Sequence, residues 1–509
     1  MLAKLHSVTL EGIEGIICEV EVDVARGGFE KTLIVGLPDA AVKESTERVK
    51  SAIINSGYKY PKTQSVVNLA PADIKKEGPA FDLPIALGML LGLGVFTSAV
   101  LKDFVIVGEL ALDGKVRPVN GVLSMAMTAK EAGFRGIIVP LDNACEAAVV
   151  QELEVYGVGS LAQAVAFLAG QLALETTVVD IKQLFDIESR YDVDFADVKG
   201  QESVKRALTV AAAGGHNILM LGPPGAGKTM LAQRLATILP PLSLAESLQT
   251  TRIYSSLGIL GRGKALMATR PVRCPHHTAS GPALIGGGAN ARPGELSLAH
   301  NGILFLDEFA EFPRHVLEMI RQPLEEGTVT VSRAKRSITY FAGFLLVASC
   351  NPCPCGFYGS DTRRCKCTPG QIERYMSRIS GPLIDRIDIH IDVPAVSFSK
   401  LRSRQSQLDS ATISKDVLRT RCVQESRFGD GKVMTNSRMT HRQVERFCKL
   451  DSSCEMLLRQ AMTEFGLSAR AHDKICKVSR TIADLAGSEE IRPEHIAEAI
   501  SYRKLDRRP

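Results

Sequence analysis

The chain alternates short apolar runs with longer stretches of helical periodicity, which is the pattern of an α/β protein. In the first third, the apolar runs have the length of strands, and the stretches between them repeat apolar residues at helical spacing. Strands are predicted at residues 33–36, 104–107 and 136–140, and helices at 40–56 and 123–132. These elements predict a first domain, residues 1–170, of α/β or α+β type.

The remaining pattern divides into three parts. Residues 171–197 predict a linker, which ends in the acidic and polar stretch 186–197. Residues 198–395 alternate strands and helices and predict a second α/β domain, whereas helical periodicity dominates residues 396–509 and predicts a helical lid. A Ser-, Gln- and Arg-rich patch at 397–410 predicts a loop between the last two parts. The expected fold class is a multidomain α/β protein.

A glycine-rich loop follows the apolar run 217–221, and a helical pattern at 230–236 follows the loop. In a P-loop, backbone N–H groups wrap the phosphates, the lysine reaches the terminal phosphates and the hydroxyl holds Mg²⁺ at a helix N-terminus. The loop consists of Gly222, Pro223, Pro224, Gly225, Ala226, Gly227, Lys228 and Thr229. It predicts binding and hydrolysis of ATP with Mg²⁺.

Two adjacent carboxylates, Asp307 and Glu308, end a later apolar run at residues 303–306. Such a pair lets Asp307 hold Mg²⁺ together with Thr229, and lets Glu308 orient or deprotonate the attacking water. The alternative is a surface strand end that carries two acids. The P-loop upstream favours the catalytic interpretation.

A Gly- and Pro-rich, poorly periodic segment separates the P-loop from these carboxylates and predicts an insertion into the core. The segment carries His276 and His277. These histidines could bind a metal ion, but Cys274 is the only further candidate ligand close to them in the sequence. A structural or nucleotide-sensing role is therefore favoured.

Two alternating stretches within residues 327–340 predict a β-hairpin. Its tip carries Arg333, Lys335 and Arg336, which suit contact with a nucleic-acid phosphate backbone without base readout. A solvated turn is the alternative. The next apolar run leads to Asn351, whose side chain is placed to contact the γ-phosphate or the attacking water.

Four of the 12 cysteines form two close pairs, Cys353 with Cys355 and Cys365 with Cys367. Two pairs of thiolates suit a tetrahedral structural Zn²⁺ site, although this spacing is tighter than that of the usual zinc motifs. Reduced, unliganded thiols and a redox pair are the alternatives. Cys350 is a substitute candidate ligand.

Three arginines complete the candidate set. Arg378 and Arg386 could reach the γ-phosphate of a neighbouring subunit and neutralise transition-state charge, and Arg470 could close onto the nucleotide from the helical lid. Each arginine alone is equally compatible with a surface position. The net charge is +5, and the basic excess in residues 401–509 suits a polyanion or simply a solvated surface.

The order of these motifs is similar to that of the magnesium-chelatase-like AAA+ ATPases, specifically the YifB/ComM family, over nearly the whole chain. The most specific stretches lie at residues 273–280, 292–308 and 351–356. The resemblance implies that Asn351 is sensor 1, Arg386 the arginine finger and Arg470 sensor 2. It also implies a helix-2 insert and a pre-sensor-1 hairpin at residues 328–340.

The family resemblance further implies a homo-hexameric ring that moves single-stranded or branched DNA. The implied activity is ATP-driven helicase and branch migration during integration of DNA by recombination, with recombination proteins as candidate partners. A magnesium-chelatase-type motor subunit and a protein-remodelling ATPase are the alternatives. The cationic hairpin tip favours DNA, because a protein unfoldase would favour an aromatic pore loop.

The first domain resembles the Lon protease domain, which uses a Ser–Lys dyad. The matching stretches place Ala80 where the serine would stand and Leu123 where the lysine would stand. Neither side chain can act as nucleophile or base. The resemblance therefore implies a Lon-like fold without peptidase activity.

Targeting signals are not evident in the sequence. The first residues lack a basic-then-apolar signal layout, and the most apolar window, residues 83–95, is too short to cross a bilayer. We therefore expect a cytoplasmic location and no membrane partner.

Overall fold

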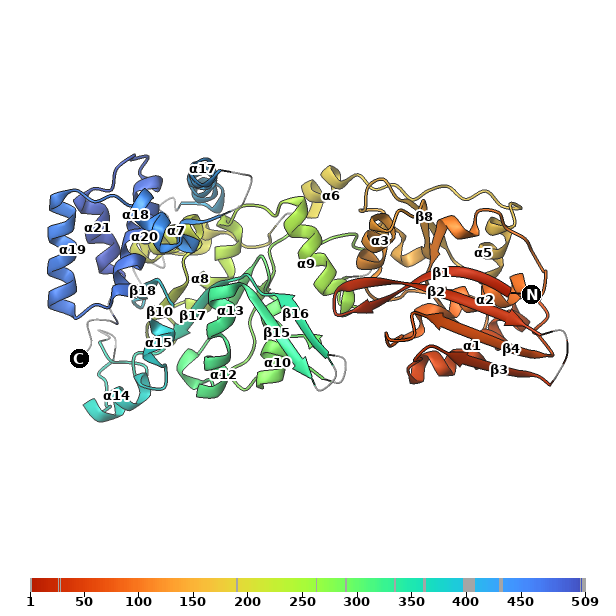
Figure 1. The fold of residues 1–509 in the computed structure, drawn as a ribbon. Helices are drawn as coiled ribbons and strands as arrows, with labels where there is room; N and C mark the ends of the chain where they lie inside the picture. Colours follow the sequence, from red (N-terminus) through yellow and green to blue (C-terminus); the bar gives the residue numbers. More distant parts are fainter. Residues whose placement is uncertain are drawn as a thin grey trace. The chain divides into compact units, whose positions relative to one another are not determined.

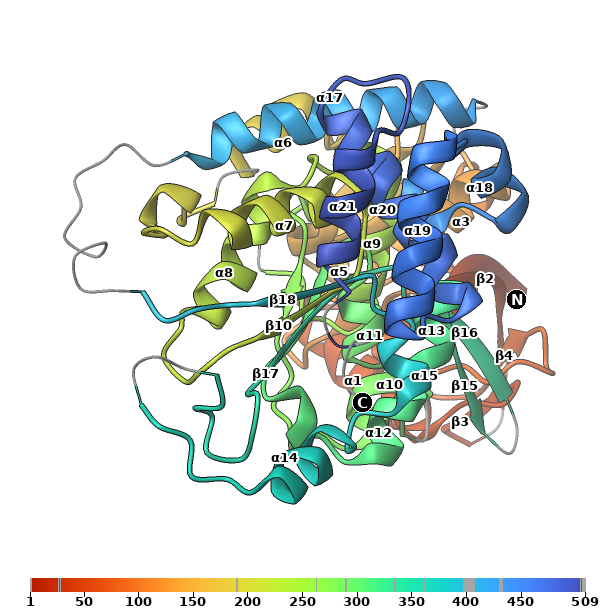
Figure 2. The ribbon, with the colours of Figure 1, turned by 90° about the vertical axis from the view of Figure 1, so that its left-hand side faces the viewer.

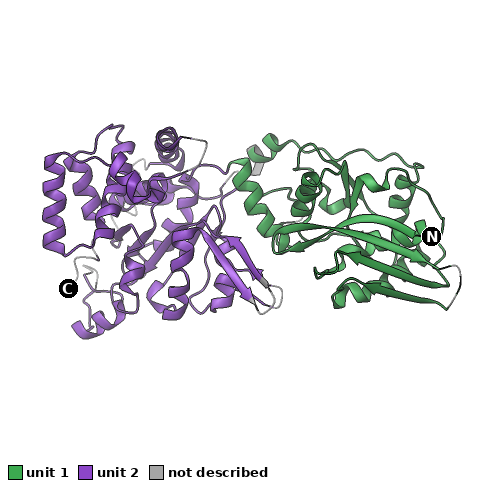
Figure 3. Cartoon of the chain, in the orientation of Figure 1, with its two compact units in different colours: residues 1–188, 243–268 green, residues 189–242, 269–509 purple. Residues whose placement is uncertain are grey.

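A computed structural model describes residues 2–25, 27, 29–188, 191–261, 263–288, 291–333, 336–359, 363–396, 408–429, 434–503 and 505, with only the backbone of 186–188, 333 and 336. The chain forms two compact units (Figure 3). The first consists of residues 1–188 and 243–268, and the second of residues 189–242 and 269–509. The segment 243–268 therefore belongs to the first unit, although the chain on both sides of it belongs to the second.

The first unit is built on a seven-stranded mixed sheet (Figure 1). Its strands, in spatial order, are β3 (Lys31–Val35), β4 (Gln64–Ala70), β2 (Glu14–Val24), β1 (Leu2–Glu11), β5 (Phe104–Ile106), β8 (Gly136–Pro140) and β9 (Glu154–Val158). β2 pairs antiparallel with β1 and β4, and the remaining pairs are parallel. A separate two-stranded ribbon joins β6 (Glu109–Leu110) and β7 (Val116–Arg117).

Helices cover both faces of this sheet. Phe104 and Ile106 of β5 join an apolar cluster with α1, α2 and α5, whereas Val105 joins another cluster with α3 and α4. This alternation follows from the two-residue period of a strand. The helices of the unit are α1 (Ala40–Asn55), α2 (Asp82–Gly92), α3 (Val122–Glu131), α4 (Ala144–Ala147), α5 (Leu161–Leu168), α6 (Ile181–Glu188) and α9 (Leu244–Ser256).

The second unit is built on a five-stranded parallel sheet. In spatial order its strands are β11 (Val272–Arg273), β14 (Ile303–Leu306), β17 (Leu345–Cys350), β10 (Ile218–Leu221) and β18 (Ile389–Asp392). β10, β14 and β17 are buried along their whole length, as expected for strands with both faces covered. Two ribbons lie apart from this sheet: β12 (Gly286–Gly287) with β13 (Arg292–Pro293), and β15 (Thr328–Arg333) with β16 (Arg336–Phe341).

Helices flank the second sheet and form the C-terminal part of the chain. α20 packs against α21 and α7, and α17 packs against α7 (Figure 2). The helices are α7 (Glu202–Gly214), α8 (Lys228–Leu235), α10 (Gly281–Ile285), α11 (Glu295–Leu298), α12 (Arg314–Met319), α13 (Arg321–Glu326), α14 (Pro369–Met376), α15 (Gly381–Ile384), α17 (Ser410–Phe428), α18 (His441–Phe447), α19 (Ser452–Phe465), α20 (Ala469–Leu485) and α21 (Pro493–Ser501).

Side-chain caps fix where several C-terminal helices begin. Asp409, Asp451 and Ser468 each accept a backbone N–H of the first turn of α17, α19 and α20, respectively. Such a cap satisfies a donor that has no partner inside the helix. Across the described ranges, we find no helix with the length and apolar character needed to cross a membrane.

Candidate nucleotide-binding site

The glycine-rich loop joins β10 to α8 at the carboxyl end of the parallel sheet, where open α/β sheets bind ligands. Gly225 and Gly227 have φ angles of +75° and +85°, which a residue with a Cβ rarely adopts. The Gly222 N–H donates to the Cys350 carbonyl at 3.2 Å, and a Cβ on Gly222 would lie 2.4 Å from the Val393 carbonyl oxygen. The loop is therefore held between the ends of β17 and β18.

Lys228, the first residue of α8, lies against this loop. Its Nζ donates to the carbonyls of Gly222 and Pro223 at 2.7 and 3.1 Å, and to Asn351 Oδ1 at 3.2 Å. Burial lowers the pKa of Lys228, and the nearby carboxylate of Asp307 opposes that shift. The structure thus brings the P-loop lysine and the predicted sensor asparagine into direct contact.

The two predicted magnesium ligands also meet. Thr229 Oγ1 donates to Asp307 Oδ2 at 3.0 Å, and Ser349 Oγ donates to Asp307 Oδ1. A hydroxyl and a carboxylate are the hard oxygen ligands that Mg²⁺ prefers, so the residues fit this ion. Sequence reasoning missed Ser349, which stands two residues before Asn351 on β17, beside the carboxyl end of β14.

Glu308 directly follows Asp307 and has a left-handed backbone, with φ of +51°. Its Oε2 lies 3.0 Å from Nδ1 of His277, and the rings of His276 and His277 lie 4.2 Å apart. Partial burial raises the pKa of the nearby Cys274 thiol. The segment between the P-loop and the carboxylates thus supplies His277, which directly contacts the predicted base Glu308. The same segment also supplies β11, the edge strand of the parallel sheet.

A further contact holds the loop from the other side. Gln201, immediately before α7, donates through Nε2 to the carbonyls of Ala226 and Pro394 at 3.0 and 2.8 Å. Gln201 is buried and has a φ of +57°. No motif marks this residue, since its role depends on two carbonyls that are far apart in sequence.

The candidate arginines have other partners. Arg386 contacts Glu325 Oε1 and the Pro382 carbonyl, each at 2.7 Å, and Arg378 contacts Glu311 Oε2 at 2.7 Å. Arg470 lies exposed in the first turn of α20. Within the described residues, the hydrogen bonds and ion pairs of Arg378 and Arg386 do not reach the P-loop.

The predicted hairpin is present as β15 and β16. Its base is anchored by the buried Tyr340, whose hydroxyl donates to the Ala291 carbonyl at 2.8 Å and whose pKa burial raises to about 12. Arg333 and Arg336 are paired across the two strands, and only their backbone is described. Lys335 lies outside the described residues.

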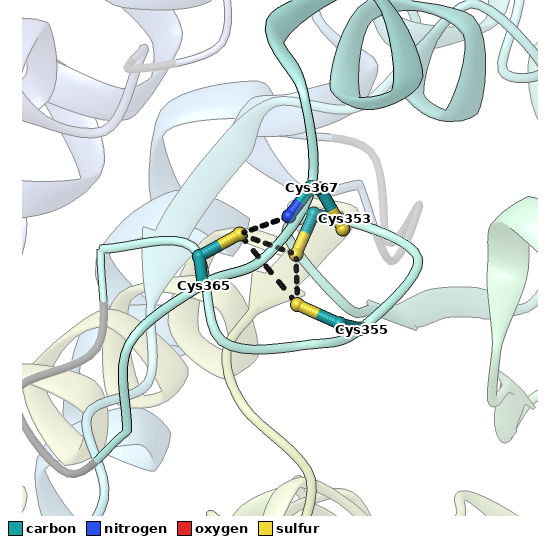
Figure 4. Close-up of side chains that lie close together, drawn as sticks. All are labelled: Cys353, Cys355, Cys365 and Cys367. Atoms are coloured by element: carbon teal, nitrogen blue, oxygen red, sulfur yellow. Dashed lines mark hydrogen bonds between the residues drawn. The ribbon is translucent and has the colours of Figure 1, made fainter.

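Four thiols gather between β17 and α14 (Figure 4). The sulfur atoms of Cys353, Cys355, Cys365 and Cys367 all lie within 4.8 Å of one another. In the part of the chain that the structure describes, no other group of three or more His, Cys, Asp or Glu side chains is close enough to share a metal ion. Cys350 is buried at the end of β17, and burial raises the pKa of its thiol to about 11.

Ala80 and Leu123, which stand where the serine and lysine of a Lon protease would be, lie in one apolar cluster. Ala80 and Leu123 are both buried in the apolar cluster that includes Val105 and Val122. The polar group beside Leu123 is the buried carboxylate of Glu146, which accepts from the Leu123 N–H at 2.9 Å and from Asn143 and Ser255.

The sheet and the site together define a class of protein. Asp307 and Glu308 directly follow β14, the P-loop directly follows β10, and Asn351 directly follows β17, which lies between these two strands. This parallel-sheet arrangement is that of a P-loop nucleoside-triphosphate-binding protein with an AAA+ type core.

Comparisons with known proteins agree with this class. Three family models match: magnesium chelatase subunit ChlI at residues 194–401, subunit ChlI of Mg-chelatase at 20–143, and the ChlI C-terminal model at 407–503. The chain is 43% identical to competence protein ComM of Haemophilus influenzae, over 99% of this chain and 98% of that protein. It is 42% identical to YifB of Escherichia coli, with the same two coverages. It is also 23% identical to the chloroplastic magnesium-chelatase subunit ChlI of Nicotiana tabacum, over 63% of this chain and 75% of that protein.

The chain therefore belongs to the YifB/ComM family of magnesium-chelatase-like proteins. Membership of this family indicates an ATPase. ATP with Mg²⁺ fits the oxygen ligands and the lysine that the P-loop presents.

Proposed function

We propose that this protein is an ATP-driven DNA motor of the ComM type, which unwinds DNA and migrates branches when DNA is integrated by homologous recombination during natural transformation. The observation that carries the proposal is the β15–β16 hairpin, which bears Arg333, Lys335 and Arg336 at its tip and belongs to the same compact unit as the P-loop. Cations at the turn of a hairpin suit the DNA backbone, which they bind without reading sequence. Single-stranded or branched DNA is the proposed partner, and recombination proteins are candidate partners.

The proposed hydrolytic step follows from the contacts at the P-loop. Lys228 would bind the terminal phosphates, and Thr229 and Asp307 would hold Mg²⁺, which neutralises phosphate charge when bound. Glu308 would orient or deprotonate the attacking water, and Asn351 would contact the γ-phosphate or that water. The direct contact of Asn351 with Lys228 supports placing these two side chains around one phosphate.

A homo-hexameric ring would give the remaining arginines their roles. Arg386 would act as the arginine finger toward a neighbouring subunit, which requires it to leave Glu325. Arg470 would act as sensor 2 from the helical lid at residues 396–509. In this proposal, residues 198–395 are the AAA+ core with its helix-2 insert and pre-sensor-1 hairpin, and the location is cytoplasmic.

We assign residues 1–170 to a Lon-like domain without peptidase activity, followed by a linker at 171–197. The side chains of Ala80 and Leu123, which carry no nucleophile and no base, support the loss of the dyad. The domain would serve as an assembly surface or guide DNA toward the motor.

The proposal is tested by measuring ATP hydrolysis with and without single-stranded DNA. We expect DNA to stimulate hydrolysis and the stimulation to fall with added salt. Replacing Arg333, Lys335 and Arg336 by Ala should abolish stimulation and leave basal hydrolysis intact. The matched control replaces the exposed Lys102, Lys115 and Arg117 of the first unit, which removes the same charge elsewhere. Hydrolysis that no nucleic acid affects would overturn the proposal.

The similarity to the tobacco magnesium-chelatase subunit favours a second candidate, a chelatase-type motor subunit. That function requires no nucleic acid. Hydrolysis that is indifferent to DNA but supports Mg²⁺ insertion into a tetrapyrrole, together with the partner chelatase subunits, would favour this alternative.

A further inference from the structure

The cysteine cluster joins two segments that border the nucleotide site. Cys353 and Cys355 belong to the loop after β17, which begins with Asn351, whereas Cys365 and Cys367 belong to the segment before α14. Figure 4 shows the four side chains converging from these two segments. Their convergence does not follow from chain proximity alone, because Cys365 comes 10 positions after Cys355 and 12 positions after Cys353.

The sulfur–sulfur distances have the size that one tetrahedral metal ion imposes. Cys353 Sγ lies 3.3 Å from Cys355 Sγ and 3.7 Å from Cys365 Sγ, and Cys355 Sγ lies 3.5 Å from Cys365 Sγ. With zinc–sulfur bonds of about 2.3 Å, the edge of a tetrahedron of thiolates is about 3.8 Å. A disulfide would require about 2.05 Å.

Backbone donors and basic side chains surround the sulfurs. The Cys367 N–H donates to Cys365 Sγ at 3.4 Å, and the N–H groups of Phe357 and Lys366 donate to Cys355. Such donors stabilise metal-bound thiolates. Four thiolates around a divalent ion leave two negative charges, which Lys366 and the arginines at positions 363 and 364 can balance.

We propose that Cys353, Cys355, Cys365 and Cys367 bind one Zn²⁺ ion, and that this ion holds the loop after β17 against the P-loop, so that zinc occupancy strengthens nucleotide binding. Soft thiolate ligands in tetrahedral geometry select zinc over magnesium or calcium. Four sulfurs this close enclose a single ion, whereas an iron–sulfur cluster spreads its cysteines around several irons.

The link to the nucleotide site is a direct contact. Gly356, next to Cys355, has a φ of +82°, and a Cβ there would lie 2.6 Å from Cδ of Pro224 in the P-loop. The Gly356 N–H donates to the Cys353 carbonyl at 2.9 Å, which closes the turn between the first two sulfurs. A metal that fixes this turn therefore fixes the wall of the P-loop beside Pro224.

The second pair of cysteines ties α14 to the same place. Thr368, immediately after Cys367, caps α14, and Tyr375 of that helix lies with its hydroxyl 4.0 Å from Cys350 Sγ. The ion would thus connect α14 to the end of β17, where Asn351 contacts Lys228. Loss of the ion should loosen the sensor asparagine and the P-loop together.

The first experiment measures metal in the purified full chain by elemental analysis. We expect about one zinc per chain in the unmodified protein and none in the double variant Cys365→Ser, Cys367→Ser. Cys422→Ser, an exposed thiol on α17, is the matched control and should retain the metal. Replacement of zinc by Co²⁺ should give the absorption of a tetrahedral tetrathiolate site. Absence of metal, or equal zinc in the double variant, would overturn the site.

The second experiment uses linkage in the unmodified protein, which avoids any failure of the variant to fold. If zinc strengthens nucleotide binding, bound nucleotide must strengthen zinc binding by the same factor, for which we expect roughly tenfold. In an equilibrium competition with a chelator, the protein should therefore hold zinc roughly tenfold more tightly when ADP is saturating, and the zinc-free protein should bind a fluorescent ADP analogue roughly tenfold more weakly. An equilibrium zinc affinity that ADP does not change would overturn the coupling.

The coupling rests on the proposed nucleotide site, and Lys228→Ala separates the two ideas. If Lys228→Ala leaves ADP binding intact, the nucleotide site itself is misassigned. If that variant loses ADP binding and keeps zinc, while zinc removal from the unmodified protein leaves ADP binding unchanged, only the coupling fails.

Discussion

Nδ1 of His277 lies 3.0 Å from Oε2 of Glu308, so the predicted catalytic base is bound by a ring from the segment between the P-loop and β14. Phe312 packs edge-on near this ring, with its centroid 6.5 Å away. A carboxylate oxygen that accepts from His277 has less capacity to accept from the attacking water. The pair therefore predicts that His277 restrains Glu308 and limits its contact with the attacking water.

Replacing His277 by Ala should raise hydrolysis in the absence of DNA several-fold and reduce the further stimulation by DNA, because Glu308 is then free to orient water. Steady-state hydrolysis with and without DNA measures both effects. His276→Ala is the control, since His276 bonds Thr278 rather than Glu308. If His277→Ala instead lowers hydrolysis as far as Glu308→Gln does, His277 supports the base and does not restrain it.

Replacing Glu308 by Gln should leave nucleotide binding intact and lower hydrolysis at least about a hundredfold, since the amide cannot take a proton from water. Equilibrium binding of a fluorescent ATP analogue, together with single-turnover hydrolysis, separates the two effects. Asp307→Asn should differ by weakening Mg²⁺-dependent binding as well. Normal turnover in Glu308→Gln would remove that residue from the water-activating role.

The local elements of the site were predictable from the sequence because their patterns are local. The apolar run at 217–221 and the glycine loop correspond to β10 and its loop to α8, and the alternation at 327–340 corresponds to β15 and β16. Glycines at Gly225 and Gly227 mark the turn itself, because few other residues adopt their φ angles.

Long-range partners were not predictable. Residues 244–256 form α9, which the sequence analysis did not predict, and nothing in the local pattern indicates that this helix belongs to the first unit. Gln201 and Ser349 carry no motif, and their roles appear only when the parallel sheet brings distant carbonyls and carboxylates together. The cysteine pairs suggested a metal, but only the fold places the neighbouring Gly356 beside Pro224.

A buried ion pair joins the sheet to the C-terminal helices and should set the response to acid. Lys474 Nζ of α20 lies 2.5 Å from Oδ1 of Asp388, just before β18. Burial raises the pKa of Asp388, but the charge of Lys474 and the contact with His216 together outweigh burial and hold the pKa well below its ordinary value. The lowered pKa of Asp388 stabilises the folded state fully when the pH is above the pKa of Asp in the unfolded chain, about 4. This stabilisation declines as the pH falls below that pKa.

Asp388→Asn should destabilise the second unit by about 3–5 kcal/mol at neutral pH, because it leaves the Lys474 ammonium buried without its counter-charge. In the variant, the free energy of unfolding should also fall less steeply below about pH 4, because Asp388 no longer takes up a proton there. Denaturant unfolding at a series of pH values measures both effects. The double variant Asp388→Asn, Lys474→Met is the control and should recover much of the loss; equal stability of the single variant and the unmodified chain would contradict the role of the pair.

The attachment of α9 to the first unit depends on Arg252. Its Nη2 donates to Glu14 Oε2 at 2.6 Å and to the Ile13 carbonyl at 2.9 Å, and its Nε donates to Ser124 Oγ at 3.2 Å. Arg252→Ala should destabilise the first unit by about 2 kcal/mol, because it leaves buried acceptors without a charged donor.

Glu14→Ala is the matched control for Arg252→Ala, because the Glu14 side chain is 66% exposed and its ion pair contributes under about 1 kcal/mol. Hydrogen exchange of α3 and α9 amides distinguishes loss of this docking from global unfolding, since only the amides of the first unit should exchange faster. If Glu14→Ala and Arg252→Ala have equal effects, the exposed ion pair, and not the contacts with Ile13 and Ser124, holds the helix. Unchanged exchange in Arg252→Ala would instead assign the docking to the apolar contacts of Leu248, which packs against the first unit from the same helix.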